Sequence, residues 1–240
     1  MTIIHANDPT TKVLSHLYEQ RQDVLITTTC TIMNRMKYIT RLAEAYKRGY
    51  KIRYKDRQDA PEIKMHYFKV KEDLPRVQVV LSFLQGIVPV GQCQSLLDIG
   101  SGRGVFLFPL LREFPELKVT SLDILPHRVE LLRCIHDGGI SNLHPLQEDI
   151  CTWNAPDKSF DVVTMLEVME HIPDTEAVVR NAVRLAKNYI IVSVPSKPDD
   201  NPDHIHLFSN EDLKRLFLDN GCNKVTFMSV TNHRVMIAKL

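Results

Sequence analysis

Short apolar runs alternate with amphipathic segments of helical length through the second half of this chain. Residues 94–100, 118–124, 160–166 and 189–195 read as strands, and the segments between them at 105–114, 126–139 and 174–188 read as helices. Asp174 is a suitable N-cap for the last of these helices, and Gly138 with Gly139 ends the one before it. Strands that alternate with helices form right-handed βαβ units, so the pattern predicts an α/β fold with a parallel sheet covered on both faces.

The last 30 residues change this pattern. Residues 210–221 predict a helix that ends at Gly221, and two strand-like segments at 223–230 and 233–240 follow, separated by a short Thr-Asn turn. Strands joined by so short a connection must pair antiparallel. The expected fold is therefore a mostly parallel sheet that ends in an antiparallel hairpin.

The first 88 residues carry helices without intervening strands. Helical segments are expected at 11–25 and at 31–49, the second ending at Gly49, and Pro75 begins a third helix that leads into the sheet. We interpret residues 1–88 as a helical cap or substrate-recognition region that packs on the sheet, and residues 89–240 as the domain that contains the sheet.

Composition narrows the class of protein. A formal net charge of +1 indicates no general attraction to polyanions, and no apolar run approaches the roughly 18 residues that span a bilayer. The start of the chain lacks the features of a signal peptide. The five cysteines are scattered and never form a CxxC pair, which favours reduced thiols. These features predict a cytoplasmic protein that does not associate with membranes.

The sequence SLLDIGSGRG, residues 95–104, places three glycines at alternate positions directly after a predicted strand. Glycines in such a loop permit positive φ angles and let the backbone approach a ligand closely. A dinucleotide fingerprint would require glycine at Val105, and no Gly-Lys-Ser or Gly-Lys-Thr follows to make a phosphate-binding P-loop.

The stretch from Asp98 to Gly104 resembles motif I, D/ExGxGxG, of the class I S-adenosylmethionine-dependent methyltransferases. The resemblance covers residues 90–240 and implies a Rossmann-like, seven-stranded sheet with S-adenosylmethionine as cofactor. It implies that Asp98 holds the cofactor's ammonium group, that Asp123 at the end of the second strand binds the ribose hydroxyls, and that Asp149, with Ile150, lies beside the adenine. The complete set that the resemblance assigns to the cofactor is Asp98, Gly100, Ser101, Gly102, Gly104, Asp123, Ile124, Asp149, Ile150 and Glu167.

The segment after the fourth predicted strand, EVMEHIPD, lies where this fold directs the methyl group. Transfer of that group is an in-line displacement, so the protein must align the nucleophile and remove its proton. His171 is the preferred base or substrate-positioning group, and Glu167 is the second catalytic candidate. We expect these side chains to line the pocket without a metal ion.

A metal-assisted alternative uses the same segment. One helical turn would place Glu167, Glu170 and His171 on a single face, and with His204 they form a set suited to Mg²⁺ or Mn²⁺. The segment resembles the ExxEH element of small-RNA 2′-O-methyltransferases and of certain ubiquinone-pathway O-methyltransferases, and residues 203–208 are faintly similar to the later histidine segment of the RNA enzymes. The resemblance thus implies either a metal-free or a metal-assisted site.

The methyl acceptor is least constrained by the sequence. No NPPY-like element follows the fourth strand, which disfavours methylation of amides or base nitrogens, so the default is an oxygen on a small molecule. From Arg35 to Arg76, thirteen Lys and Arg face six Asp and Glu, and Tyr46, Tyr50 and Tyr54 lie among them. This segment is either a solvated helical face or a surface for single-stranded nucleic acid.

Two further classes of protein remain open. A nicotinamide-dependent oxidoreductase is disfavoured by Val105, and a catalytically silent cofactor-binding module is disfavoured by the retention of Asp98, Asp123 and Asp149. The oligomeric state is not indicated.

Overall fold

The structure is a computed structural model that describes residues 34, 36–55 and 73–240. The helix expected at 11–25 and Cys30 lie outside these residues. The chain forms two compact units, residues 1–43 and 44–240, and the fold below is that of the second unit. Within the described ranges, no helix is both long enough and apolar enough to span a membrane.

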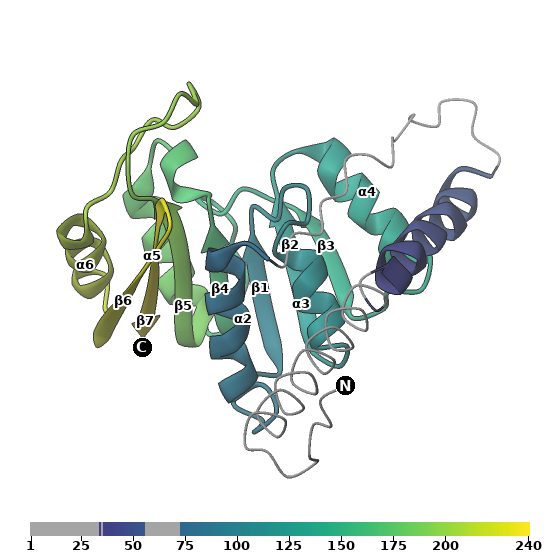
Figure 1. Ribbon diagram of the computed structural model, residues 1–240, viewed down its shortest axis with the longest axis horizontal. Coiled ribbons are helices and arrows are strands. Elements are labelled where there is room, and N and C mark those ends of the chain that lie inside the picture. The colour runs from purple at the N-terminus through teal and green to yellow at the C-terminus, as the bar shows by residue number, and fades with distance from the viewer. Residues whose placement is uncertain (1–33, 35, 56–72) are drawn as a thin grey trace, which may run out of the picture. The chain divides into compact units, whose positions relative to one another are not determined.

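A seven-stranded sheet forms the centre of the second unit (Figure 1). The strands are β1 Ser95–Ile99, β2 Lys118–Asp123, β3 Leu143–Gln147, β4 Phe160–Leu166, β5 Ala186–Pro195, β6 Lys224–Val230 and β7 His233–Lys239. Their order is β3-β2-β1-β4-β5-β7-β6; β7 pairs antiparallel with β5 and β6, and all other pairs are parallel. The predicted parallel sheet with a terminal antiparallel hairpin is confirmed.

The connections between parallel strands are helical, as the alternating pattern predicts. The helices of the sheet region are α2 Pro75–Ile87, α3 Leu107–Glu113, α4 Pro126–Asp137, α5 Thr175–Leu185 and α6 Asn210–Asp219, together with a 3-10 turn over Met169–His171. From β1 the chain proceeds through β2 to β3, and from β4 it proceeds in the opposite direction to β5. Because both sets of connections are right-handed, α3 and α4 lie on one face of the sheet and α5 lies on the other. Figure 1 shows α2 in front of the sheet and α5 behind it.

The ends of these helices have identifiable signals. The Asp174 carboxylate accepts a hydrogen bond from the Ala177 N–H at the start of α5, as predicted. Ser209 and Asp212 form a reciprocal capping box at the start of α6, and Pro75 occupies the first turn of α2. Local sequence thus fixes where each of these three helices begins.

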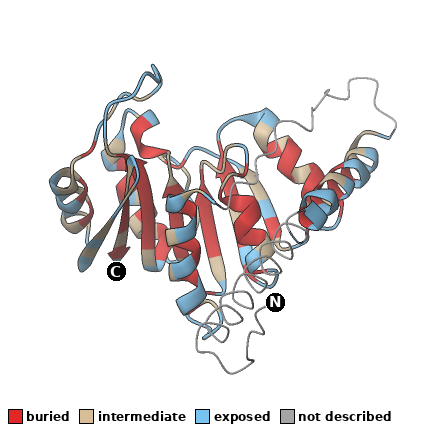
Figure 2. Ribbon diagram, viewed as in Figure 1, coloured by how far each residue is buried: buried red, intermediate tan, exposed pale blue. Residues whose placement is uncertain are grey.

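The core lies on both faces of the central strands, which Figure 2 shows as buried. β4 and β5 contribute Val163, Met165, Ile190 and Val192, all fully buried, and α5 covers them with Val178 and other apolar residues of one face. Near-continuous apolar runs are expected in parallel strands because both faces are covered. The four cysteines among the described residues are free.

Two expected helix ends differ from the structure by three residues or more. The helix expected over 174–188 ends at Leu185, because Ala186 already pairs with Phe160 of β4 and its carbonyl accepts a hydrogen bond from Lys158 Nζ. The helix expected to end at Gly49 runs through residue 54. A Cβ at Gly49 would lie 1.8 Å from the Cys134 carbonyl oxygen, so this glycine permits close packing on α4 and is not a helix stop.

Candidate active site

The glycine loop follows β1 at the point where the order of the strands reverses. β1 and β4 are neighbours, and their connections leave in opposite directions, which opens a crevice at their carboxyl ends. Gly100 and Gly104 have φ angles of +66° and +79°, and a Cβ at either position would collide with the side chain of Val168 or Phe108. Glycine is therefore required here both by the turn and by the packing around it.

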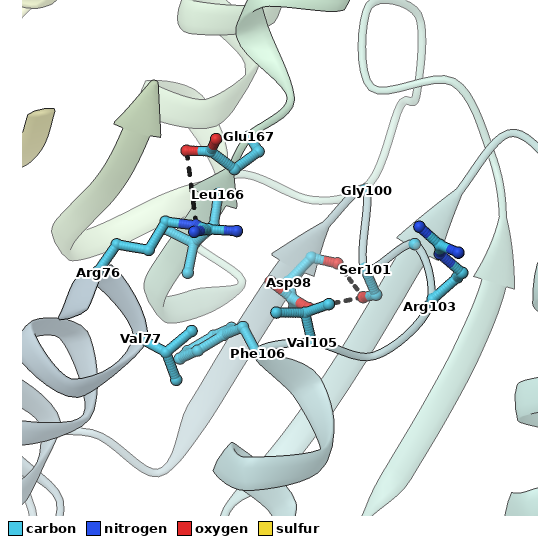
Figure 3. Close-up of a pocket in the computed structure, with 11 residues that line it drawn as sticks. Arg76, Val77, Asp98, Gly100, Ser101, Arg103, Val105, Phe106, Leu166 and Glu167 are labelled. Atoms are coloured by element: carbon cyan, nitrogen blue, oxygen red, sulfur yellow. Dashed lines mark hydrogen bonds and ion pairs between the residues drawn. The ribbon is translucent and has the colours of Figure 1, made fainter. Parts of the chain in front are cut away.

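A pocket of about 160 Å³ opens beside this loop (Figure 3). The loop after β1, the end of β4 and the start of α2 provide its walls. Its lining residues are Arg76, Val77, Asp98, Gly100, Ser101, Gly102, Arg103, Val105, Phe106, Leu166 and Glu167. The structure thus brings together five residues of the predicted cofactor set: Asp98, Gly100, Ser101, Gly102 and Glu167.

Asp98 is a buried carboxylate at this pocket. Its Oδ2 accepts a hydrogen bond of 2.6 Å from Ser101 Oγ, and its Oδ1 accepts one of 2.7 Å from Thr164 Oγ1. Burial raises the pKa of Asp98 to about 6; the two hydrogen bonds oppose the rise, and the charge of Asp123 adds to it. A cation in the pocket would stabilise the ionised form of this side chain, as an ammonium group does.

Asp123 holds the glycine loop from the end of β2. One carboxylate oxygen accepts a hydrogen bond from the Gly102 N–H at 3.3 Å, and the other accepts one from the Leu125 N–H at 2.9 Å. The next residue, Ile124, is 61% exposed although it is large and apolar. Asp123 and Ile124 do not line the pocket beside Asp98. They place an acidic and an apolar side chain next to each other at the carboxyl edge of the sheet.

Asp149 and Ile150 follow β3. The Asp149 carboxylate is exposed and accepts a hydrogen bond from the Cys151 N–H. The Ile150 side chain is only 2% exposed and lies in the hydrophobic core. Any contact of Ile150 with a bound ring would therefore use its backbone, and neither residue belongs to the pocket beside Asp98.

Glu167 lies at the end of β4 with a φ angle of +60°, a conformation that costs a residue other than glycine about 1–3 kcal/mol. Three neighbours hold its carboxylate. Ser193 Oγ donates to Oε1 at 2.7 Å, His233 Nε2 lies 3.0 Å from Oε2, and Arg76 Nε lies 3.8 Å from Oε1. Figure 3 shows the Arg76–Glu167 pair among the residues that line the pocket.

The single helical face expected for Glu167, Glu170 and His171 is absent. Glu167 is in the left-handed conformation, and only Met169–His171 form a turn of 3-10 helix, so Glu167 turns away towards His233. The remaining members of the set do meet. Ligand atoms of Glu170, His171 and His204 all lie within 4.8 Å of one another.

The cluster of Glu170, His171 and His204 contains a buried acid without a hydrogen-bond partner among the described residues and two histidines that are each held through Nδ1. Glu170 is fully buried, neither of its carboxylate oxygens has a hydrogen-bond partner among the described residues, and burial raises its pKa to about 8. His171 Nδ1 contacts the Asp203 carbonyl at 2.9 Å, and His204 Nδ1 contacts the Asp199 carboxylate at 2.9 Å. Both contacts leave Nε2 available to a ligand. A hollow of about 220 Å³ lies beside His204.

Sequence reasoning missed three residues that shape the first pocket. Nothing in the sequence marks Arg76 as a pocket residue, because it precedes the strand pattern. Since α2 runs antiparallel to β1, its N-terminal end lies at the carboxyl edge of the sheet. Thr164 and His233 lie within predicted strands, and only the pairing of β1 with β4 and of β5 with β7 brings them beside Asp98 and Glu167.

Comparison with known proteins identifies the family. Residues 54–226 match the family described as a methyltransferase domain. A ubiquinone biosynthesis O-methyltransferase from Neisseria meningitidis is 28% identical over 134 residues, a match that covers 53% of this chain and 54% of that protein. The chain thus spans about half the length of this curated relative, and a smaller share of others, such as 39% of the enzyme of the same name from Serratia proteamaculans.

Solved structures show the same fold. A SAM-dependent methyltransferase from Aquifex aeolicus aligns with a TM-score of 0.57 at 19% identity, covering 69% of this chain and 89% of that one. Magnesium protoporphyrin IX methyltransferase from Synechocystis, solved with bound S-adenosylhomocysteine, aligns with a TM-score of 0.54 at 20% identity, covering 68% and 82%. The chain belongs to the methyltransferase-domain family, within the class I S-adenosylmethionine-dependent methyltransferases.

Proposed function

We propose that this protein transfers the methyl group of S-adenosylmethionine to an oxygen of a small-molecule acceptor. The observation that carries the proposal is the pocket at the β1–β4 switch point, where the glycine loop, Asp98 and Glu167 meet. The name of the Neisseria relative supports oxygen as the nucleophile. A cytoplasmic location, expected from the scattered cysteines, is part of the same proposal.

The residues present fit the cofactor. The amino acid part of S-adenosylmethionine carries an ammonium and a carboxylate, and the pocket offers Asp98 and Glu167 together with Arg76 and Arg103. The glycine loop has no room for a Cβ at Gly100 or Gly104. When bound, the cofactor supplies an activated methyl group on a sulfonium.

The chain's own residues then have separable tasks. Asp98 would hold the ammonium, and Arg76 would face the carboxylate from the start of α2. Asp123 fixes the loop through Gly102 and lies next to the exposed Ile124, which offers an apolar face to a ring. His171, with Nδ1 directed at a backbone carbonyl, keeps Nε2 for the acceptor's proton.

A calorimetric and a kinetic measurement test these roles. Asp123→Ala should lose most of the affinity for S-adenosylhomocysteine, because the loop and the ribose site both depend on that carboxylate. His171→Ala should keep the affinity and lose turnover by about 10²–10⁴-fold, the usual contribution of a general base. His144→Ala, an exposed histidine on β3, is the matched control and should change neither. Equal loss of binding in the Asp123 and His171 variants would contradict the assignment.

The lack of a hydrogen-bond partner for Glu170 among the described residues favours a second candidate mechanism, in which a divalent cation assists the methyl transfer. A fully buried carboxylate without a partner is costly, and a cation held by Glu170, His171 and His204 would satisfy it. The contacts of His171 and His204 through Nδ1 orient Nε2 in the manner common to metal-binding histidines. The cation would position the acceptor oxygen and lower the pKa of its hydroxyl.

Titration of the chelator-treated protein with Mn²⁺ tests this candidate. Saturable binding should be lost in His204→Ala and Glu170→Gln and retained in His144→Ala. Retention of Mn²⁺ binding in Glu170→Gln would eliminate the assignment of Glu170 as a ligand. Absence of binding in the unaltered protein would leave the metal-free mechanism with His171 as base.

A further inference from the structure

An acid and a cation meet the glycine loop at the same residue. Asp123, the last residue of β2, accepts a hydrogen bond from the Gly102 N–H at 3.3 Å. Arg128 lies in the first turn of α4, and its Nη1 is 3.1 Å from where a Cβ of Gly102 would be. The carboxylate and the guanidinium therefore both adjoin the loop at Gly102.

These two side chains do not bond to each other. The hydrogen bonds to the Asp123 carboxylate come from the backbone N–H groups of Gly102 and Leu125, and the side chains of Asp123 and Arg128 form no ion pair with each other. Each carboxylate oxygen can accept a further hydrogen bond. Opposite charges that adjoin one residue without meeting can be bridged by a ligand that bonds to both.

The Arg128 side chain is held at the loop at a cost in stability. It is partly buried, and its Nε is buried without a hydrogen-bond partner among the described residues. A buried donor that has exchanged water for no acceptor destabilises the folded state. Packing alone therefore does not explain why an arginine occupies this position.

The start of α4 also disfavours a cation at residue 128. The helix begins at Pro126, its first turn contains no acidic residue, and Leu125 supplies no side-chain cap. The N-terminus of a helix carries a partial positive charge, so a cation in the first turn is repelled by it. Two local conflicts at one residue are typical of a residue kept for function.

A vicinal diol is the group whose chemistry matches this pair. A hydroxyl donates one hydrogen bond and accepts others, so adjacent hydroxyls can donate to the Asp123 carboxylate and accept from the Arg128 guanidinium. An anionic ligand would be repelled by Asp123, and a cationic one by Arg128. The pair therefore favours an uncharged part of a ligand that carries neighbouring hydroxyl groups.

We propose that Arg128 binds the ribose hydroxyls of S-adenosylmethionine together with Asp123. This inference rests on the proposed function, which supplies the ligand, and deepens it by adding a binding residue from α4. The two arginines then serve opposite ends of the cofactor. Arg76 faces the carboxylate of the amino acid part from α2, and Arg128 holds the ribose.

Isothermal titration with three ligands tests the proposal in the full chain. The ligands are S-adenosylhomocysteine, 5′-methylthioadenosine and the 2′,3′-dideoxy analogue of 5′-methylthioadenosine. Arg128→Met keeps a long side chain of similar helix propensity and removes the donors. The variant should bind the first two ligands roughly tenfold or more weakly, the usual effect of losing hydrogen bonds from a charged donor. Its affinity for the dideoxy analogue should equal that of the unaltered protein, because this ligand has no ribose hydroxyls.

Two further variants give contrasting patterns. Arg76→Met should weaken the binding of S-adenosylhomocysteine and leave that of 5′-methylthioadenosine unchanged, because the second ligand lacks the carboxylate. Arg180→Met removes an exposed arginine from α5 and is the control, so it should leave all three affinities unchanged.

Thermal unfolding without ligand separates a binding role from a structural one. Arg128→Met should raise the midpoint of unfolding by about 2–4 °C, because it removes a buried donor without a partner and a cation at a helix N-terminus. An arginine kept for packing would lower the midpoint when replaced.

Three results would overturn the proposal while the proposed function stands. They are an unchanged affinity of Arg128→Met for S-adenosylhomocysteine, an equal loss of affinity for 5′-methylthioadenosine and its dideoxy analogue, and a lowered midpoint of unfolding. Absence of S-adenosylhomocysteine binding by the unaltered protein would instead contradict the proposed function, and this inference with it.

Discussion

Asp98 shows how one residue can weaken the fold in order to serve the site. Its carboxyl has an ordinary pKa of 3.8 and one of about 6 when folded, because it is buried. The folded protein therefore holds this proton to a higher pH than the unfolded chain, so its contribution to stability is largest below pH 4 and falls as the pH rises towards 6. Between low pH and neutral pH, this shift lowers the free energy of unfolding by about 3 kcal/mol.

Asp98→Asn removes this ionisation and tests its effect on stability. The free energy of unfolding of the variant, relative to that of the unaltered protein, should be larger at pH 7 than at pH 4, as measured by urea denaturation at both values; the variant is thus relatively more stable at pH 7. Affinity for S-adenosylhomocysteine should fall at the same time, because the amide cannot supply the negative charge. A variant whose relative stability is the same at both pH values would show that Asp98 titrates normally.

His233 is the second residue whose role depends on its surroundings. Its Nδ1 contacts the Thr231 carbonyl at 2.9 Å and its Nε2 contacts the Glu167 carboxylate at 3.0 Å. The two contacts engage both ring nitrogens and hold the imidazole between the Thr231 carbonyl and the Glu167 carboxylate. We infer that His233 positions Glu167 against the pocket from the start of β7.

His233→Phe keeps the ring and removes the contact. The variant should bind S-adenosylhomocysteine about tenfold or more weakly, because a hydrogen bond to a charged group contributes about 1.5–3 kcal/mol. His144→Phe, on the exposed β3 edge, is the control, and isothermal titration of both variants is the measurement. Unchanged affinity in His233→Phe would show that Glu167 is held sufficiently by Ser193 and Arg76.

At the level of elements, the α/β alternation predicted most of the sheet correctly. Short apolar runs between helical segments predicted the positions of β1, β2 and β4. The short turn between β6 and β7 predicted that these strands form an antiparallel hairpin. The ends of helices and strands were harder to predict than their presence, because some ends depend on contacts with distant parts of the chain. Ala186 joins β5 through pairing with β4, and Gly49 lies inside its helix, where α4 packs against it and leaves no room for a Cβ.

Gly49 gives a direct test of that helix packing. Gly49→Ala would force a Cβ against the Cys134 carbonyl and should destabilise the protein by about 1–3 kcal/mol, the usual cost of overpacking. Gly86→Ala in α2 is the matched control, because a Cβ at that position would meet no atom within 4 Å. It should stabilise by about 0.4–1 kcal/mol through the loss of unfolded-state freedom. Thermal unfolding that ranks the two variants in the opposite order would contradict the packing of this helix on α4.

For the molecule as a whole, the switch point between β1 and β4 determines where chemistry can occur. The family resemblance assigned Asp98, the three glycines and Glu167 to the cofactor, and Asp98, Gly100, Gly102 and Glu167 line one pocket, whereas Gly104 does not line it. The separation of Glu167 from Glu170 was not predictable, because it depends on one left-handed residue that the sequence does not mark. The roles assigned to all of these residues, and to Asp123, Ile124, Asp149, Ile150 and His171, stay predictions, as does the division of the chain near residue 88.

The most direct test of the central claim is calorimetric titration with S-adenosylhomocysteine. We predict saturable binding in the micromolar range for the unaltered protein and at least tenfold weaker binding for Asp98→Asn, with thermal unfolding as the check that the variant is folded. Absence of binding by the unaltered protein, or equal affinity in the two proteins, would contradict the claim that the pocket beside the glycine loop holds the cofactor.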